Sequence, residues 1–249
     1  MKSDLAVTFS MGIETMVDSV VGVATHAGTQ RLATVINTKT PPAYYAVRGF
    51  LDTACADVWP PQVGALVAEP VGKQILDEAK SLVTQTWTGR YVRARAGLLP
   101  PLAEDPSHYG PNPKPTGEGR YNGRKEPCLY LAETVAVARA EMRASATDVV
   151  YMQAFELDLS ELRFLELPRN AEATHPHLNA ILFVAEQDAN QDETIYRPSH
   201  VVRFLLETLG ISGFQYPSVR GAGVGSNLIL WGPALGRAMS QMAGVPKPC

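Results

Sequence analysis

Three arginines alternate with other side chains in the stretch Arg90-Tyr-Val-Arg93-Ala-Arg95. The stretch predicts a strand over residues 91–96. Successive side chains of a strand point to opposite faces, so Arg93 and Arg95 share a face with Tyr91. Two guanidiniums on one face can bind a pyrophosphate, because each offers a planar fork of donors. A solvated strand face is the alternative interpretation of this stretch taken alone.

A second segment combines a cation, an aromatic ring and an amide between two glycines, at Gly119-Arg-Tyr-Asn-Gly123. This composition predicts a tight turn. A short apolar strand is expected to follow over residues 127–132, with a single tyrosine at its centre. The side chains that this region offers to a ligand are Arg120, Tyr121, Asn122 and Tyr130.

A carboxylate lies on the apolar side of the next predicted helix, over residues 134–143. Glu141 follows Thr134, Val137 and Ala138 at spacings of seven, four and three, which places these four residues on one helix face. A carboxylate that points into the fold is costly to desolvate unless it is paired. Glu141 is therefore either half of a structural ion pair with an arginine or a functional group in a pocket.

A third segment, Gly213-Phe-Gln-Tyr-Pro-Ser-Val-Arg-Gly221, places Ser218 just after a predicted strand. The hydroxyl could face a ligand there, although a strand-ending turn is the usual structure for such a sequence.

Two other patterns predict no chemistry. Gly221-Ala-Gly-Val-Gly225 has the wrong glycine spacing for a dinucleotide loop and precedes a predicted strand, so we expect a hairpin connection. His175-Pro-His177 lacks a third ligand nearby, so we expect a surface loop and no metal site.

The predicted elements divide the chain into residues 1–86, a helical N-terminal region, and residues 87–249, a mixed catalytic domain. Short strands without a regular βαβ period favour an α+β sheet over a doubly wound one. The long proline-rich segment 97–119 is a candidate lid. We expect helices over residues 13–23, 43–58, 71–84, 134–143 and 198–209, and strands over 91–96, 127–132, 149–159, 163–167, 213–216 and 227–231.

Composition excludes several classes of function. The 249 residues include 22 basic and 25 acidic side chains, a net charge of -3 that does not suit direct binding of nucleic acid. No apolar run is long enough for a membrane span. Three scattered cysteines do not form a disulfide framework, and acidic residues at positions 4, 14 and 18 do not suit a signal peptide. We therefore expect a cytoplasmic protein.

Taken together, these segments resemble the RES-domain family, which is named for its arginine, glutamate and serine. The resemblance covers about residues 88–235 and rests on the arginine strand, the Gly-Arg-Tyr-Asn turn, Leu129-Tyr-Leu-Ala132, the helix with Glu141, and Tyr216-Pro-Ser-Val-Arg220. It implies a compact fold similar to the ADP-ribosyltransferases and a toxin that consumes NAD as its substrate, with no other cofactor. It also implies a protein antitoxin with a helix-turn-helix. Carried over by position, the site is Arg93, Arg120, Tyr130, Glu141 and Ser218, with the register open between Arg93 and Arg95 because Val92 replaces the usual aromatic residue.

Cleavage of the nicotinamide–ribose bond passes through a centre that resembles an oxocarbenium ion. We expect Glu141 to stabilise that charge, the arginines to hold the pyrophosphate, Tyr121 or Tyr130 to stack on the ligand, and Ser218 to bind the nicotinamide end. The nucleophile stays open between water, phosphate and a protein side chain. The alternatives are an ADP-ribosyltransferase with a protein target and a non-enzymatic binding protein. Residues 1–86 could bind the antitoxin, form a homo-oligomer or serve delivery.

Overall fold

The structure is a computed structural model that describes residues 43–56, 60–112, 119–123, 125–145, 147–166, 174–186, 196–218 and 225–249. The helix expected over residues 13–23 lies outside these ranges. Among the described helices, none combines the length and the apolar character that crossing a bilayer would need.

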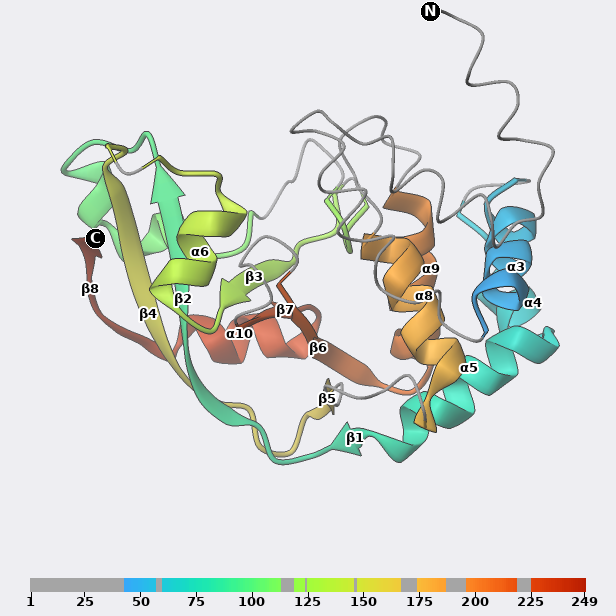
Figure 1. Ribbon diagram of the computed structural model, residues 1–249. Coiled ribbons are helices and arrows are strands. Elements are labelled where there is room, and N and C mark those ends of the chain that lie inside the picture. Colours follow the sequence, from blue (N-terminus) through green and yellow to red (C-terminus); the bar gives the residue numbers. More distant parts are fainter. Residues whose placement is uncertain are drawn as a thin grey trace, which may run out of the picture.

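An eight-stranded sheet runs through the described part of the chain, in the order β1-β5-β6-β7-β3-β2-β4-β8 (Figure 1). The neighbours are antiparallel except for the parallel pair β5 and β6. Helices flank the sheet, and the α+β prediction is confirmed. The strands are β1 (Val83–Thr84), β2 (Thr88–Ala96), β3 (Leu129–Ala132), β4 (Val150–Asp158), β5 (Arg163–Glu166), β6 (Ile211–Pro217), β7 (Ser226–Leu230) and β8 (Met242–Pro248).

The strands β2 and β3 meet at one residue pair, Val92 with Ala132. Beyond that pair β2 continues along β4 as far as Ala96, whereas β3 pairs with β7. Among the described residues, no strand therefore lies beside the arginine half of β2 on the β3 side, and the sheet is split there. This split is where the candidate site lies.

Five helices cover one end of the sheet, on the right of Figure 1. They share one core, in which Val47 and Ile75 pack with Leu178 and Val201, and all four side chains are almost fully buried. Burial of apolar surface is what holds these helices to the sheet. The helices are α3 (Tyr44–Ala56), α4 (Val63–Ala68), α5 (Pro70–Ser81), α8 (Pro176–Glu186) and α9 (Arg197–Thr208).

A second core lies at the other end of the sheet, under α10 (Pro233–Met239). There Trp87, Tyr91 and Phe155 pack with Ala234 and Ala238 of the helix. Tyr91 points into this core, and its position on β2 sets the alternation that places Arg93 and Arg95 on the same face.

Several elements differ from the sequence-based expectation. The helix expected over residues 71–84 ends at Ser81, because Val83 and Thr84 pair with β5 as a short edge strand. Pro176 and His177 begin α8 and His175 directly precedes it, so this segment is a helix start rather than a surface loop. The hairpin expected around Gly221–Gly225 is confirmed, since β6 and β7 pair antiparallel as far as Pro217 and Ser226, although residues 219–224 lie outside the described ranges.

Candidate functional site

The short helix α6 (Val135–Glu141) positions the glutamate that the sequence singled out. Thr134 caps its start, since the Oγ1 atom accepts a hydrogen bond from the Val137 amide at 3.2 Å. Val137 and Ala138 are buried against Ala132, Val92 and Ala94. Glu141 is the last residue of the helix and lies on this same buried side.

The Glu141 carboxylate receives two hydrogen bonds on one oxygen. Its Oε1 atom accepts from the Ser218 hydroxyl at 2.7 Å and from the Asn227 side-chain amide at 2.8 Å. Ser218 follows the end of β6, and Asn227 lies on the neighbouring β7. Both donors are almost fully buried. Two hydrogen bonds of this kind fix the orientation of the carboxylate.

Arg93 and Arg95 are held by the first part of the segment 97–119. The Arg93 Nη1 atom donates to the carbonyl oxygens of Tyr109 at 3.2 Å and Gly110 at 2.8 Å, and Arg95 Nε donates to His108 at 3.2 Å. Tyr109 is fully buried, so this half of the candidate lid packs against the sheet. Residues 113–118 of the segment lie outside the described ranges.

The positive charge at the two arginines has no carboxylate partner within the described part of the chain. Burial, followed by repulsion from Arg95, lowers the pKa of Arg93 to about 9. Burial also lowers the pKa of Arg95. Two partly desolvated guanidiniums that extend side by side from one strand form a site for an anion.

The Gly119–Gly123 turn is confirmed, and it wraps around the Tyr130 hydroxyl. This oxygen accepts from the Tyr121 amide and donates to Asn122 Oδ1, each at 2.9 Å. A Cβ atom at Gly119 would collide with Asn122 Oδ1 and lie 3.1 Å from the Tyr130 hydroxyl, so the turn requires glycine. Burial raises the pKa of Tyr130 well above its ordinary value, which keeps the hydroxyl protonated as a donor.

Two side chains of helix α9 contact this turn. His200 Nε2 lies 2.9 Å from the Gly119 carbonyl oxygen, and Arg203 Nη1 donates to the Tyr121 carbonyl at 3.1 Å and to Glu126 at 3.2 Å. Neither His200 nor Arg203 was expected near the site from the sequence. Their partners are about 80 residues away, so no local pattern shows the contact.

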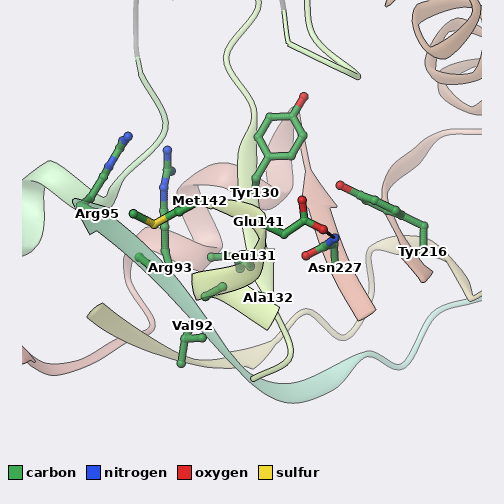
Figure 2. A pocket seen from close by; sticks show the side chains of 12 residues that line it. Val92, Arg93, Arg95, Tyr130, Leu131, Ala132, Glu141, Met142, Tyr216 and Asn227 are labelled. Carbon is green, nitrogen blue, oxygen red and sulfur yellow. Dashed lines mark hydrogen bonds between the residues drawn. The ribbon is translucent and has the colours of Figure 1, made fainter. Parts of the chain in front are cut away.

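A cavity of about 290 Å³ opens at the split between β2 and β3. Figure 2 shows the two guanidiniums and the Tyr130 hydroxyl directed toward the same end, with Glu141 and Asn227 joined nearby and Tyr216 beyond them. The lining residues are Val92, Arg93, Ala94, Arg95, Tyr130, Leu131, Ala132, Ala138, Glu141, Met142, Tyr216 and Asn227. The cavity therefore has a cationic end and a carboxylate, separated by aromatic and apolar walls.

The residues expected at the site fall into two groups. Arg93, Arg95, Tyr130 and Glu141 line the cavity, and Ser218 contacts Glu141 rather than lining it. The remaining three form the turn beside it: the Tyr121 ring is fully buried against Phe214 and Tyr216, Asn122 is bonded to Tyr130, and the Arg120 guanidinium lies 5.9 Å from the centre of the Tyr216 ring.

The burial of Tyr121 gives it a different position from the one expected. A ring with no exposed surface, packed edge-on against Phe214, offers no face for a ligand to stack on. Tyr130 therefore is the tyrosine of this pair that lines the cavity, whereas Tyr121 anchors the turn to the core.

Two of the polar or aromatic lining residues were not expected at the site from the sequence. Asn227 was assigned only to a strand, and Tyr216 only to the motif before Ser218. A polar amide directly before the apolar run Leu-Ile-Leu-Trp was a usable signal, because asparagine is depleted in strands and a buried amide needs a partner.

His177, in the first turn of α8, contacts the carboxylate that caps this helix. His177 Nδ1 lies 2.8 Å from Glu78 Oε1, and the Leu178 amide donates to Glu78 Oε2 at 2.7 Å, so a carboxylate from α5 caps α8. No cluster of three possible metal ligands occurs among the described residues.

Comparison with known proteins shows which family the chain belongs to. No curated protein matches the chain. Solved structures with a match include the crystal structure of the M. tuberculosis MbcT–MbcA toxin–antitoxin complex, with 16% identity over 72% of this chain and 93% of that chain and a TM-score of 0.43. The family model of the RES domain matches residues 90–247, which contain the cavity and both donors to Glu141. With well over half of its length matched, the chain belongs to the RES-domain family.

Proposed function

We propose that this protein cleaves the nicotinamide–ribose bond of NAD, with water or inorganic phosphate as the attacking group. The observation that carries the proposal is the pairing within one cavity of an oriented carboxylate, Glu141, with two half-buried cations, Arg93 and Arg95. NAD carries a pyrophosphate and a glycosidic bond, and the described residues offer a matching group for each.

The arginines would bind the pyrophosphate. Arg93 uses Nη1 for two backbone carbonyls, which fixes the plane of its guanidinium while Nε and Nη2 remain as further donors. Anion binding would also offset the desolvation that lowers the pKa of Arg93. The cavity is at the small end for ligand sites, so we place the nicotinamide riboside and the pyrophosphate inside and the adenosine at the rim.

Glu141 would act at the other end. When the bond between C1′ and the nicotinamide nitrogen breaks, its electron pair leaves with nicotinamide, which departs neutral, and positive charge develops on the ribose. A fixed carboxylate beside the ribose stabilises that charge in the transition state. The nucleophile then bonds to C1′: attacking water releases a proton to the solvent, whereas hydrogen phosphate attacks through an oxygen that is already deprotonated. Ser218, which contacts Glu141 in this structure, is assigned to holding the carboxylate rather than the nicotinamide.

The test is incubation of purified protein with NAD, with and without phosphate, followed by chromatography. We expect release of nicotinamide, with ADP-ribose as the second product if water attacks and its 1″-phosphate if phosphate attacks. Glu141→Gln keeps the shape and removes the charge, so turnover should fall by about 10²- to 10³-fold. Glu156→Gln, an exposed glutamate on β4 outside the cavity, is the matched control.

Three outcomes would contradict the proposal. Folded protein that releases no nicotinamide excludes NAD cleavage. Full turnover in Glu141→Gln excludes the assigned role of the carboxylate. Label from NAD that stays covalently attached to an added protein indicates an ADP-ribosyltransferase instead.

We also propose, from the family, that the protein acts as a toxin and that a protein antitoxin with a helix-turn-helix binds it. Expression in bacterial cells should deplete NAD and arrest growth, and Glu141→Gln should abolish both effects. Protein isolated from its native cells should gain NAD-cleaving activity when bound proteins are removed. Equal activity before and after removal would argue against an inhibitory partner.

A further inference from the structure

Asn227 is a buried polar side chain in an apolar strand. It lies on β7 before Leu228, Ile229 and Leu230, all fully buried, and is itself 5% exposed. A buried amide without partners is costly, and asparagine is a poor strand former. The local sequence therefore gives no structural reason for an amide at this position, and its contacts must supply one.

The backbone of Asn227 is held on both sides. It pairs with Ala132 of β3 and with Tyr216 of β6, in the middle of the eight-stranded order. The side chain reaches from this fixed position into the wall of the cavity, where Nδ2 donates to Glu141 Oε1 at 2.8 Å (Figure 2). The sheet thus supplies a rigid donor to the carboxylate.

Glu141 needs such support because of where it lies. The helix α6 has seven residues, and Glu141 is its final one, two positions before Arg143, which has a positive φ of 55°. The ends of short helices fray, and most of their stability comes from tertiary contacts. A carboxylate at this end has no fixed direction from the helix alone.

The start of β7 holds α6 at both of its ends. Before the helix, Glu133 Oε2 accepts from the Ser226 amide at 2.9 Å and from the Ser226 hydroxyl at 2.8 Å. At the end of the helix, Asn227 donates to Glu141. Two consecutive residues of one central strand therefore set the position of the whole helix.

The type of donor also matters. A lysine or arginine at position 227 would fix the carboxylate but neutralise its field, which would weaken its effect on positive charge at the ribose. A neutral amide orients the group and leaves its charge in place. We infer that Asn227 is a positioning residue, which holds the Glu141 carboxylate in the direction that bond cleavage requires. This inference rests on the proposed function.

The test compares Asn227→Leu, which keeps the size and removes the donor, with the wild-type protein. A misdirected Glu141 would act mainly in the transition state, so kcat for NAD cleavage should fall by about 10- to 100-fold while KM changes by less than about threefold. Gln241→Leu is the matched control, because the Gln241 amide makes two hydrogen bonds to the Asp158 backbone away from the cavity. Its kcat should stay within about twofold of wild type.

Asn227→Asp provides a second readout that a purely structural role would not change. The new carboxyl can donate to Glu141 only while it carries a proton, and two ionised carboxylates at this separation repel each other. Its kcat relative to wild type should therefore rise as the pH falls from 8 to 6. A ratio that does not change with pH, or a parallel rise in KM for Asn227→Leu, would overturn the inference.

Thermal unfolding separates failure of this inference from failure of the proposed function. In a double-mutant cycle, Asn227→Leu should lower Tm by about 3 °C or more beyond its effect in a Glu141→Ala background, because the hydrogen bond exists only when both partners are present. Coupling without NAD cleavage in the wild type would refute the proposed reaction and leave the contact intact. Absence of coupling would refute the positioning role, whatever the activity.

Discussion

Arg93 keeps a positive charge where solvation is poor. Its guanidinium is bonded to two backbone carbonyls, and burial lowers its pKa to about 9. The charged form is therefore less stable in the empty cavity than in water, and an anionic ligand restores part of that loss. Ligand affinity at this end of the cavity should therefore depend strongly on Arg93.

Arg93→Met retains most of the stem and removes the charge. KM for NAD should rise by about 10- to 100-fold, which corresponds to the loss of hydrogen bonds to a charged group. ADP-ribose should also raise Tm less in the variant than in the wild type. Arg90→Met, on the same strand but exposed and outside the cavity, should leave both quantities unchanged. Equal effects of the two variants would contradict a specific role for Arg93.

The Gly119 turn gives a second prediction at the same scale. An alanine Cβ would separate Asn122 from the Tyr130 hydroxyl, so Gly119→Ala should lower Tm and reduce NAD cleavage together. Gly49→Ala is the control, since no atom lies within 4 Å of the new Cβ in helix α3. It should stabilise the protein by about 0.5–1 kcal/mol. Calorimetry on both variants checks the opposite signs.

Among the elements, the short 3-10 helix η3 (Pro106–Tyr109) lies between a titratable carboxyl group, that of Asp105, and the arginines of the site. It presents the carbonyls that hold Arg93 and Arg95, and Asp105 caps its start by accepting from the Ser107 amide at 2.9 Å. The hydrogen bonds with Ser107 lower the pKa of Asp105. Folding therefore favours its ionised form.

The contribution of Asp105 should vary with pH in a defined direction. A carboxyl group whose pKa falls on folding stabilises the fold at pH values above its pKa in the unfolded state, which is about 4. This stabilisation is lost as the pH falls through the pKa of the folded state. At pH 7, Asp105→Ala should unfold at a slightly lower temperature than wild type, and the gap should close below about pH 4. Leu102→Ala, at an exposed neighbour that does not titrate, should show a gap that does not change with pH. Tm measured across this range checks both.

Local signals predicted most of the elements around the site. Alternation indicated β2, apolar spacing indicated α6, and the paired glycines indicated the turn beside Tyr130. These features depend on residues within about ten positions of each other, which is the range over which periodicity and turn chemistry act.

Elements without such signals were missed. β8 contains Gly244, Pro246 and Pro248, which oppose strand formation in a sheet interior, and it forms because it pairs only with β4 at the sheet edge. α8 and α10 each begin with a proline, and proline is as typical of a turn as of the first turn of a helix. At the site, Asn227 was missed because its partner Glu141 lies 86 residues earlier.

At the scale of the whole molecule, the helices before residue 87 share a core with the RES-domain region. Ile75 of α5 is fully buried together with Leu178 of α8 and Val201 of α9, both of which lie within the matched range. The division at residues 86 and 87 stays a prediction from the sequence. The packing indicates that neither side buries this apolar surface without the other.

Ile75→Ala tests how far this shared core supports the site. Deleting a fully buried isoleucine side chain should lower the free energy of unfolding by about 2–5 kcal/mol. Lys73→Ala, exposed on the same helix, should stay within about 0.5 kcal/mol of wild type. Denaturant titration measures both. A single transition for the whole protein in both variants would support one cooperative unit, whereas a separate early transition in Ile75→Ala would support two.

The sequence separation between Glu141 and its two hydrogen-bond donors determines when the site can form during protein synthesis. Glu141 leaves the ribosome 77 residues before Ser218 and 86 before Asn227, and the last strand, β8, ends at Pro248. At about 5–20 residues per second, the carboxylate waits roughly 4–17 s for Asn227 to be synthesised. A nascent chain therefore cannot complete its site until residue 227 has been synthesised, so the Glu141 carboxylate of a growing chain lacks this orienting donor during that time.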